Sequence, residues 1–291
     1  MTIAPVNSGT FPFADGNTGH SCNLGSAPSV GDLDVLCINS DTTVNTAALI
    51  SAGWSLRRSD VTNQGAYILS RKAVGGEGST VTVTTSGNFN TVVSWSRWSG
   101  TNAFDVSAGT QVNTSLGSQT PSHSTGAMAE TGELVIAFAA VHATQLANQA
   151  VTAWTGGITQ LTEGRQGSGN SGVYAQVGYA LNAGTAALSP QANWSGDTCQ
   201  DRYMLTATFT AAAGGTTFPV TLAATAVASG TSLSVHAVRR VTLNPVNVVS
   251  GTSLVPTGSA VAYVRRGGST TLAAGLAGAV KRGGVTYTFG S

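Results

Sequence analysis

The sequence predicts an all-β protein, and three observations lead to that expectation. Charged residues make up only 9% of the 291 residues, and the Glu, Lys, Leu and Gln that long helices need are scarce. Residues 80–84 read Thr-Val-Thr-Val-Thr, an alternation that gives a strand one buried and one solvent-facing side. Glycine occurs 37 times and supplies the positive φ angles of turns between strands.

An internal repeat organises the first 212 residues. Residues 31–36 read Gly-Asp-Leu-Asp-Val-Leu, and residues 132–137 echo them as Gly-Glu-Leu-Val-Ile-Ala. The strand and turn signals that follow keep the same order in both copies. We therefore expect one domain, 1–212, with repeated halves at about 28–110 and 130–212. Neither half has enough strands for a two-layer core, so together they should form one antiparallel, jelly-roll-like β-sandwich.

Several segments are expected in or near the interior of this sandwich. Residues 134–141 are continuously apolar, which is typical of a central strand covered on both faces, with a helix as the alternative. Residues 41–50 could hold a short helical turn. Five aromatic residues are candidates for the core: Trp54, Tyr67, Trp95, Trp98 and Tyr174.

Residues 213–291 are expected to form a small β-rich region that assembles with other subunits. They follow a small-residue linker, and residues 222–233 match residues 243–254. About eighty residues with few aromatics bury too little apolar surface to stand alone, so we expect a homo-oligomer, a trimer, built through this region.

Charge is divided unequally between the two regions. Residues 1–212 carry seven basic and twelve acidic side chains, whereas residues 213–291 carry six basic and no acidic ones. The basic residues could contact neighbouring subunits, or they could keep a charge-poor chain soluble. The candidate inter-subunit contacts are Arg239, Arg240, Arg265, Arg266, Lys281 and Arg282.

Catalytic and metal-binding motifs are not apparent. The four histidines lack metal-ligand spacing, and no nucleophile elbow or phosphate-binding loop occurs. Asp32 and Asp34 lie on one strand face and could be interpreted as paired carboxylates. Because Asp32 follows a turn and Glu133 mirrors it, we expect these carboxylates to accept hydrogen bonds from turn amides. We expect no enzyme activity, no cofactor and no metal.

Three cysteines, Cys22, Cys37 and Cys199, are too few for a disulfide framework. A Cys22–Cys37 bond remains possible, although buried free thiols are the preferred interpretation. The first residues lack the basic and apolar regions of a secretory signal, and no apolar run reaches the length of a membrane span. We therefore expect synthesis in the cytoplasm without secretory export, and no membrane insertion.

Two tryptophans, Trp154 and Trp194, lie in loop-like sequence surroundings and are candidates for glycan contact by stacking. The alternative is that they pack against the ends of the sandwich. Nucleic-acid binding is not expected, because the basic doublets lack interleaved aromatics and neighbouring strand residues point to opposite faces.

The repeat resembles a known type of module. The resemblance rests on four segments of the first copy. They are residues 30–36 (Val-Gly-Asp-Leu-Asp-Val-Leu), 52–58 (Ala-Gly-Trp-Ser-Leu-Arg-Arg), 66–73 (Ala-Tyr-Ile-Leu-Ser-Arg-Lys-Ala) and 98–106, where Trp-Ser-Gly-Thr precedes Phe-Asp-Val. It covers roughly residues 28–210 and is similar to jelly-roll-type β-sandwich modules of minor tail and other structural proteins of tailed bacteriophages, especially those of actinobacteria. Residues 216–291 match no such module.

The resemblance implies a virion component without catalytic residues, often oligomeric and sometimes in contact with the host surface. We expect a minor tail protein whose partners are copies of itself, other virion proteins and a host cell-surface glycan. A capsid decoration or head fibre protein and a carbohydrate-binding adhesin module are the alternatives.

Overall fold

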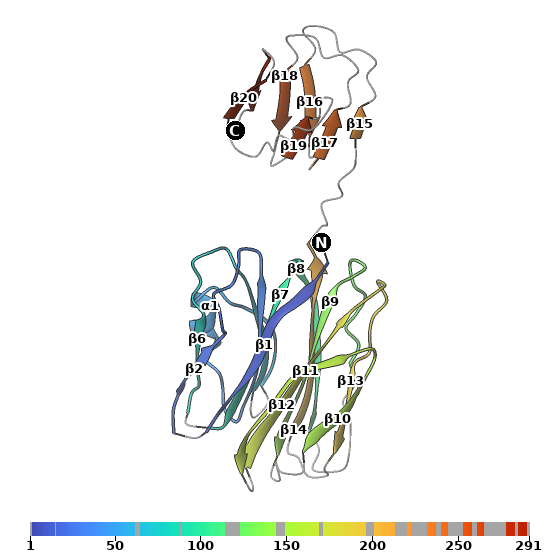
Figure 1. Ribbon diagram of the computed structural model, residues 1–291. Coiled ribbons are helices and arrows are strands. Elements are labelled where there is room, and N and C mark those ends of the chain that lie inside the picture. The colour runs from blue at the N-terminus through green and yellow to red at the C-terminus, as the bar shows by residue number, and fades with distance from the viewer. Residues whose placement is uncertain are drawn as a thin grey trace. The chain divides into compact units, whose positions relative to one another are not determined.

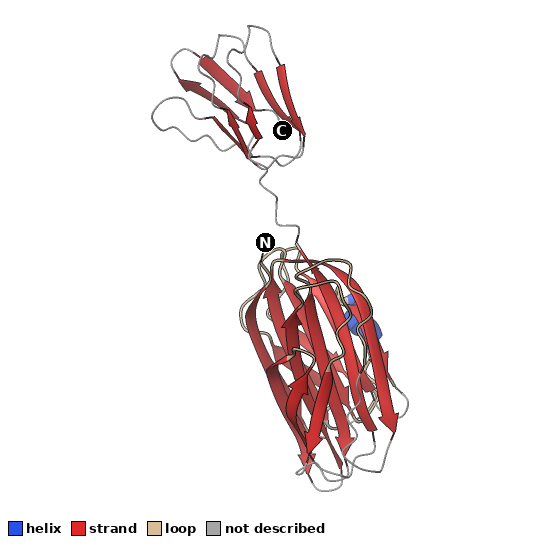
Figure 2. Cartoon of the chain, turned by 90° about the vertical axis from the view of Figure 1, so that its right-hand side faces the viewer, coloured by secondary structure: helices blue, strands red, loops and turns tan. Residues whose placement is uncertain are grey.

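The computed structural model divides the chain into two compact units, residues 1–214 and 215–291 (Figure 1). In the first unit it describes residues 2–14, 16–61, 65–87, 89–113, 123–143, 149–168, 171–195 and 201–212, and in the second unit the seven strands given below. Strands dominate, and the described residues contain one short helix, α1 (Thr46–Ser51) (Figure 2). The all-β prediction is confirmed, and α1 overlaps the segment where a helical turn was expected.

The first sheet of unit 1 contains five antiparallel strands with β3 at its centre. In spatial order they are β1 (Ala4–Phe13), β7 (Thr91–Ser99), β3 (Leu33–Ser40), β5 (Gly65–Lys72) and β4 (Ser55–Asp60). All eight residues of β3 are buried, because other layers cover both faces of the sheet.

The second sheet repeats this arrangement with later strands. Its order is β8 (Thr101–Asn113), β14 (Asp201–Ala211), β9 (Leu134–Ala143), β12 (Ser171–Leu181) and β11 (Thr159–Ser168). Position by position, β1 corresponds to β8, β7 to β14, β3 to β9, β5 to β12 and β4 to β11. The central strand β9 confirms the strand interpretation of residues 134–141. The correspondence begins at β1 and passes to the second copy at β8, so the structural repeat relates residues 4–99 to residues 101–211.

The two five-stranded sheets face each other in an approximately two-fold arrangement. The edge strand β1 lies against β11, and the corresponding strands β8 and β4 also lie against each other. Exchanging the two sheets therefore interchanges these two edge contacts. The core between the sheets is built from alternate residues of the central strands, including Leu33, Val35, Ile136 and Phe138.

Each five-stranded sheet also has a smaller layer on its outer face. The pair β2 (Gly19–Asn23) and β6 (Thr80–Thr84), together with α1, covers the first sheet and encloses a core around Trp54. The pair β10 (Ala150–Thr155) and β13 (Gln191–Ser195) covers the second sheet and encloses a core around Tyr174. Figure 1 shows both pairs outside the facing sheets.

The expectation that neither half forms a two-layer core is therefore wrong, because three apolar cores are present among the described residues. Each half encloses a core of its own, and the third lies between the halves. The five candidate core aromatics are all buried, which confirms that prediction. They are distributed over all three cores rather than gathered in one.

The second unit contains parallel strands at a constant spacing of 21 residues. One sheet has the order β15 (Val220–Leu222), β17 (Arg240–Leu243) and β19 (Val261–Val264), with Val220 paired to Val241 and Val241 to Ala262. A second pairs β16 (Ser232–His236) with β18 (Ser253–Thr257) in the same register. An antiparallel hairpin follows, β20 (Gly278–Arg282) and β21 (Val285–Phe289).

Candidate functional site

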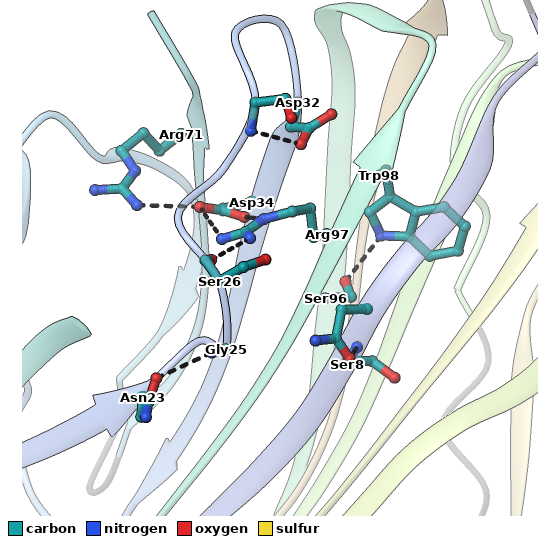
Figure 3. Close-up of polar contacts among 12 residues, drawn as sticks. Ser8, Asn23, Gly25, Ser26, Asp32, Asp34, Arg71, Ser96, Arg97 and Trp98 are labelled. Atoms are coloured by element: carbon teal, nitrogen blue, oxygen red, sulfur yellow. Dashed lines mark hydrogen bonds and ion pairs between the residues drawn. The ribbon is translucent and has the colours of Figure 1, made fainter. Parts of the chain in front are cut away.

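Three ionisable side chains, Asp34, Arg71 and Arg97, form a buried charge cluster on the first sheet. Nε of Arg97 lies 2.6 Å from Oδ1 of Asp34, and Nη2 of Arg71 lies 3.0 Å from Oδ2 of the same carboxylate (Figure 3). Nη1 of Arg97 donates to the carbonyl of Ser26 at 2.6 Å. The Asp34 and Arg97 side chains are each 1% exposed.

Strand register brings these three residues together. Asp34 on β3 lies directly opposite Arg71 on β5 and Arg97 on β7. Cross-strand neighbours of opposite charge stabilise a sheet, and burial strengthens their hydrogen bonds. The Arg71 guanidinium also lies over the Trp54 ring, 4.6 Å from its centroid. With both oxygens of Asp34 accepting from guanidinium groups, the cluster is suited to holding strands in register rather than to proton transfer.

Carboxylates just before β3 and β9 accept hydrogen bonds from the turns that precede these strands. Oδ2 of Asp32 accepts from the N–H of Ser29 at 2.9 Å, and Oε1 of Glu133 accepts from the N–H of Glu130 at 2.7 Å. Both bonds reach back three residues across a glycine with positive φ, Gly31 or Gly132. The expected role is confirmed for Asp32 and Glu133, and it is wrong for Asp34, which accepts from Arg71 and Arg97 instead of turn amides. The paired-carboxylate interpretation is not supported.

Glu133 differs from Asp32 in having an acidic neighbour. It is fully buried, and burial raises the pKa of its carboxyl; the nearby Asp105 carboxylate raises this pKa further, while the Glu130 N–H partly opposes the shift. Oδ2 of Asp105 accepts from the N–H of Ala129, so the two carboxylates bind successive amides of one turn.

The raised pKa of Glu133 leads to a pH-dependent prediction. The Glu133 carboxyl binds its proton more tightly in the folded state than in the unfolded state. Its contribution to the free energy of unfolding is therefore complete below the unfolded-state pKa and is lost as the pH rises through the folded-state pKa. Glu133→Gln should remove that loss, so the free energy of unfolding should fall less between acidic and neutral pH than in the native protein. Urea denaturation across this pH range measures the difference.

Asp32→Asn is the matched control for Glu133→Gln, since it neutralises the carboxylate at the equivalent turn of the first half. It should cost about 1 kcal/mol by weakening a charge-assisted bond, and it leaves the Glu133 carboxyl in place. Parallel pH profiles for Glu133→Gln and the native protein would contradict the prediction.

The two tryptophans proposed for glycan contact lie on strands, not in loops, which corrects the interpretation of their surroundings. Trp194 on β13 is buried, and its ring packs edge-on against Tyr174 at 5.6 Å between centroids. Trp154 on β10 is half-buried, and its indole N–H donates to Gln176. Both belong to the outer core of the second half. The buried ring of Trp194 has no exposed face for stacking on a sugar, so only Trp154 remains a candidate contact.

The basic residues of the second unit are described only in part. Arg240 lies on β17, and Lys281 and Arg282 lie on β20. Arg239, Arg265 and Arg266 lie outside the described residues. The inter-subunit role of the whole group stays a prediction.

Cys22 and Cys37 are free and buried, in agreement with the preferred interpretation of the sequence. They belong to different cores: Cys22, on β2, faces the core of the first half, and Cys37 lies between the two large sheets. Burial raises the pKa of the Cys22 thiol to about 12 and raises that of Cys37 as well, so both are unreactive. Cys199 lies outside the described residues.

A polar cluster that sequence reasoning missed lies where β3 and β9 end. Nε2 of His142 lies 2.5 Å from Oδ1 of Asp41, and both side chains are buried. The Asn39 amide donates across the interface to the carbonyls of Val141 and Tyr174. A signal existed: Asp41 and His142 are 101 residues apart, as are Asp32 and Glu133, so the repeat places them at equivalent positions.

Comparisons with known proteins do not identify this chain. No protein-family model matches it, and neither a curated protein nor a solved structure shows significant similarity to it. Over the described residues, no group of three or more His, Cys, Asp or Glu side chains could hold a metal ion. Within the same residues, no helix has the length and apolar character needed to cross a membrane.

Proposed function

We propose that the chain is a structural component of a bacteriophage virion, a minor tail protein that assembles as a homo-oligomer through its C-terminal region. The observation that carries the proposal is the parallel, in-register pairing of the C-terminal strands at 21-residue spacing. Among the described strands, β15 and β19 each pair on one side only. Edge strands of this kind accept strands from other chains. The residues proposed to contact neighbouring subunits are Arg239, Arg240, Arg265, Arg266, Lys281 and Arg282.

The fold proposed for each half of unit 1 is a jelly-roll-type sandwich of its own. In the first half, the order β1-β7-β3-β5 in one layer and β2-β6 in the other makes the chain alternate between layers, as in jelly rolls. The second half has the corresponding order in its five-stranded sheet. This assignment agrees with the resemblance of residues 28–210 to phage structural modules, and the structural use of Asp32, Asp34 and Glu133 supports a non-enzymatic role.

The oligomerisation proposal is tested by comparing the full chain with residues 1–214. The truncated chain retains the three apolar cores of unit 1, so it should stay folded. By light scattering we expect a trimer for the full chain and a monomer for residues 1–214. A monomeric full chain, or an unchanged subunit number after truncation, would contradict the proposal.

The virion location needs a separate measurement. Antibodies against unit 1 should label the tail of intact particles in electron micrographs. Labelling of the capsid would favour a decoration or head fibre protein, and particles without label would refute the virion role. Sugar contact through Trp154 is tested on a glycan array, with Trp154→Ala as the variant.

A further inference from the structure

We infer that Asp41 and His142 form a specificity element that makes the face of the first half pair with the second half and not with another copy of itself. The interface concerned lies between the two facing sheets of unit 1. The inference is independent of the proposed virion role.

The two halves of unit 1 are built like the two partners of a symmetric dimer. Their strand orders correspond throughout, and exchange of the halves preserves the contacts β1 to β11 and β4 to β8. In a two-fold interface the same patch on each partner meets its own equivalent. Geometry alone would therefore allow a first half to pair with the first half of a second chain.

Asp41 and His142 occupy equivalent positions and meet each other across this interface. Asp41 follows β3 directly, and His142 lies near the end of the corresponding strand β9. Nε2 of His142 lies 2.5 Å from Oδ1 of Asp41, and the side chains are 8% and 4% exposed, respectively. Equivalent residues come this close only near the two-fold axis, so each would meet its own copy in a pairing of like halves.

The neighbouring strands carry a second pair of equivalent residues. Asn90 donates from Nδ2 to Oδ2 of Asp41 at 3.3 Å in the first half. Asp201 lies opposite His142 on the adjacent strand β14 in the second half. The first half thus presents Asp41 beside Asn90, and the second half presents His142 beside Asp201.

Pairing of like halves would bring like groups together. Two first halves would bury Asp41 against another Asp41, and two second halves would bury His142 against another His142. Two buried carboxylates repel each other, and a His142 that faces another His142 loses its carboxylate partner, so both pairings of like halves are disfavoured. Asn39 also distinguishes the two halves. It donates two hydrogen bonds to the second half, whereas the equivalent residue of the second half, Ala140, has no side-chain donor.

The test exchanges the four residues in the full-length chain. Asp41→His alone and His142→Asp alone place like groups at the axis, and each should lower the folding equilibrium constant by about 100-fold. The quadruple variant D41H/N90D/H142D/D201N interchanges the four residues between the halves and so restores an Asp–His contact at the axis. It should return the equilibrium constant to within about tenfold of the native value. If the quadruple variant loses as much as the single substitutions combined, the specificity inference is wrong.

A second measurement separates partner selection from a merely stabilising ion pair. Differently tagged D41H and H142D chains are refolded together and separately, and the complexes are weighed by native mass spectrometry. Exchange of halves should create Asp–His pairs between the two chains, so mixed complexes should exceed their statistical share. Differently tagged native chains are the control and should mix only statistically. A purely statistical distribution for the two variants would overturn the inference.

Discussion

Replacing Asp34 by Asn is expected to lower the free energy of unfolding by about 3–5 kcal/mol, because removal of one partner leaves a buried charge uncompensated. Arg97 has 1% side-chain exposure and directs two of its nitrogens to Asp34, at 2.6 and 3.3 Å. Arg71 reaches the same carboxylate from the other side. An amide has nearly the shape of the carboxylate but offers its N–H₂ to these donors, so the loss reports charge and bonding rather than packing. Chemical denaturation monitored by tryptophan fluorescence measures it.

A matched control for Asp34→Asn is Asp32→Asn, two residues earlier in the chain. Asp32 makes one described bond, to a turn amide, and its replacement should cost about 1 kcal/mol. If the two substitutions cost the same, the cluster does not hold the three strands together. The double variant D34L/R97M should lose less than Asp34→Asn, since apolar residues of similar volume can replace a buried ion pair.

The Asp34 cluster also marks the limit of what the sequence can predict. Alternation and repetition are local signals, and they were sufficient for the all-β class, for β9 as a central strand and for the turn carboxylates Asp32 and Glu133. The partners of Asp34 are 37 and 63 residues away. They become neighbours only through the register of three strands, which one sequence does not determine.

The corrected interpretation of Trp194 has a different physical cause. The residues around it are small and polar, which is typical of a loop. In the structure, residues 191–195 form β13, in which alternate residues are buried, and Trp194 fills the space between β13 and the second sheet. Five residues of alternation are too short a signal to outweigh the polar surroundings. Asp41 and His142 were missed for a related reason. The visible repeat covers only the start of β3 and β9, and the equivalence of these two residues appears only when the 101-residue spacing is applied to the ends of the strands.

Gly100→Ala is expected to destabilise unit 1 by about 3 kcal/mol or more, from backbone strain together with a steric clash. Gly100 is the single residue between β7 in the first sheet and β8 in the second, so the chain crosses from one half to the other there. Its φ is +74°, and a Cβ would lie 2.4 Å from the carbonyl oxygen of Thr2. Its own carbonyl accepts from the N–H of Ala212 at 2.6 Å, which leaves the turn little freedom to shift.

Gly76→Ala separates the two components of this effect. Gly76 has a φ of +87°, and a Cβ added there would have nothing within 4 Å, so the substitution should cost only the conformational penalty of about 1 kcal/mol. The additional stability lost in Gly100→Ala is then due to the steric clash with Thr2, where the chain crosses between the halves. Thermal unfolding of both variants gives this difference directly. Equal melting temperatures would mean that the crossing can relax, and that the connection between the halves is not held as rigidly as its backbone contacts imply.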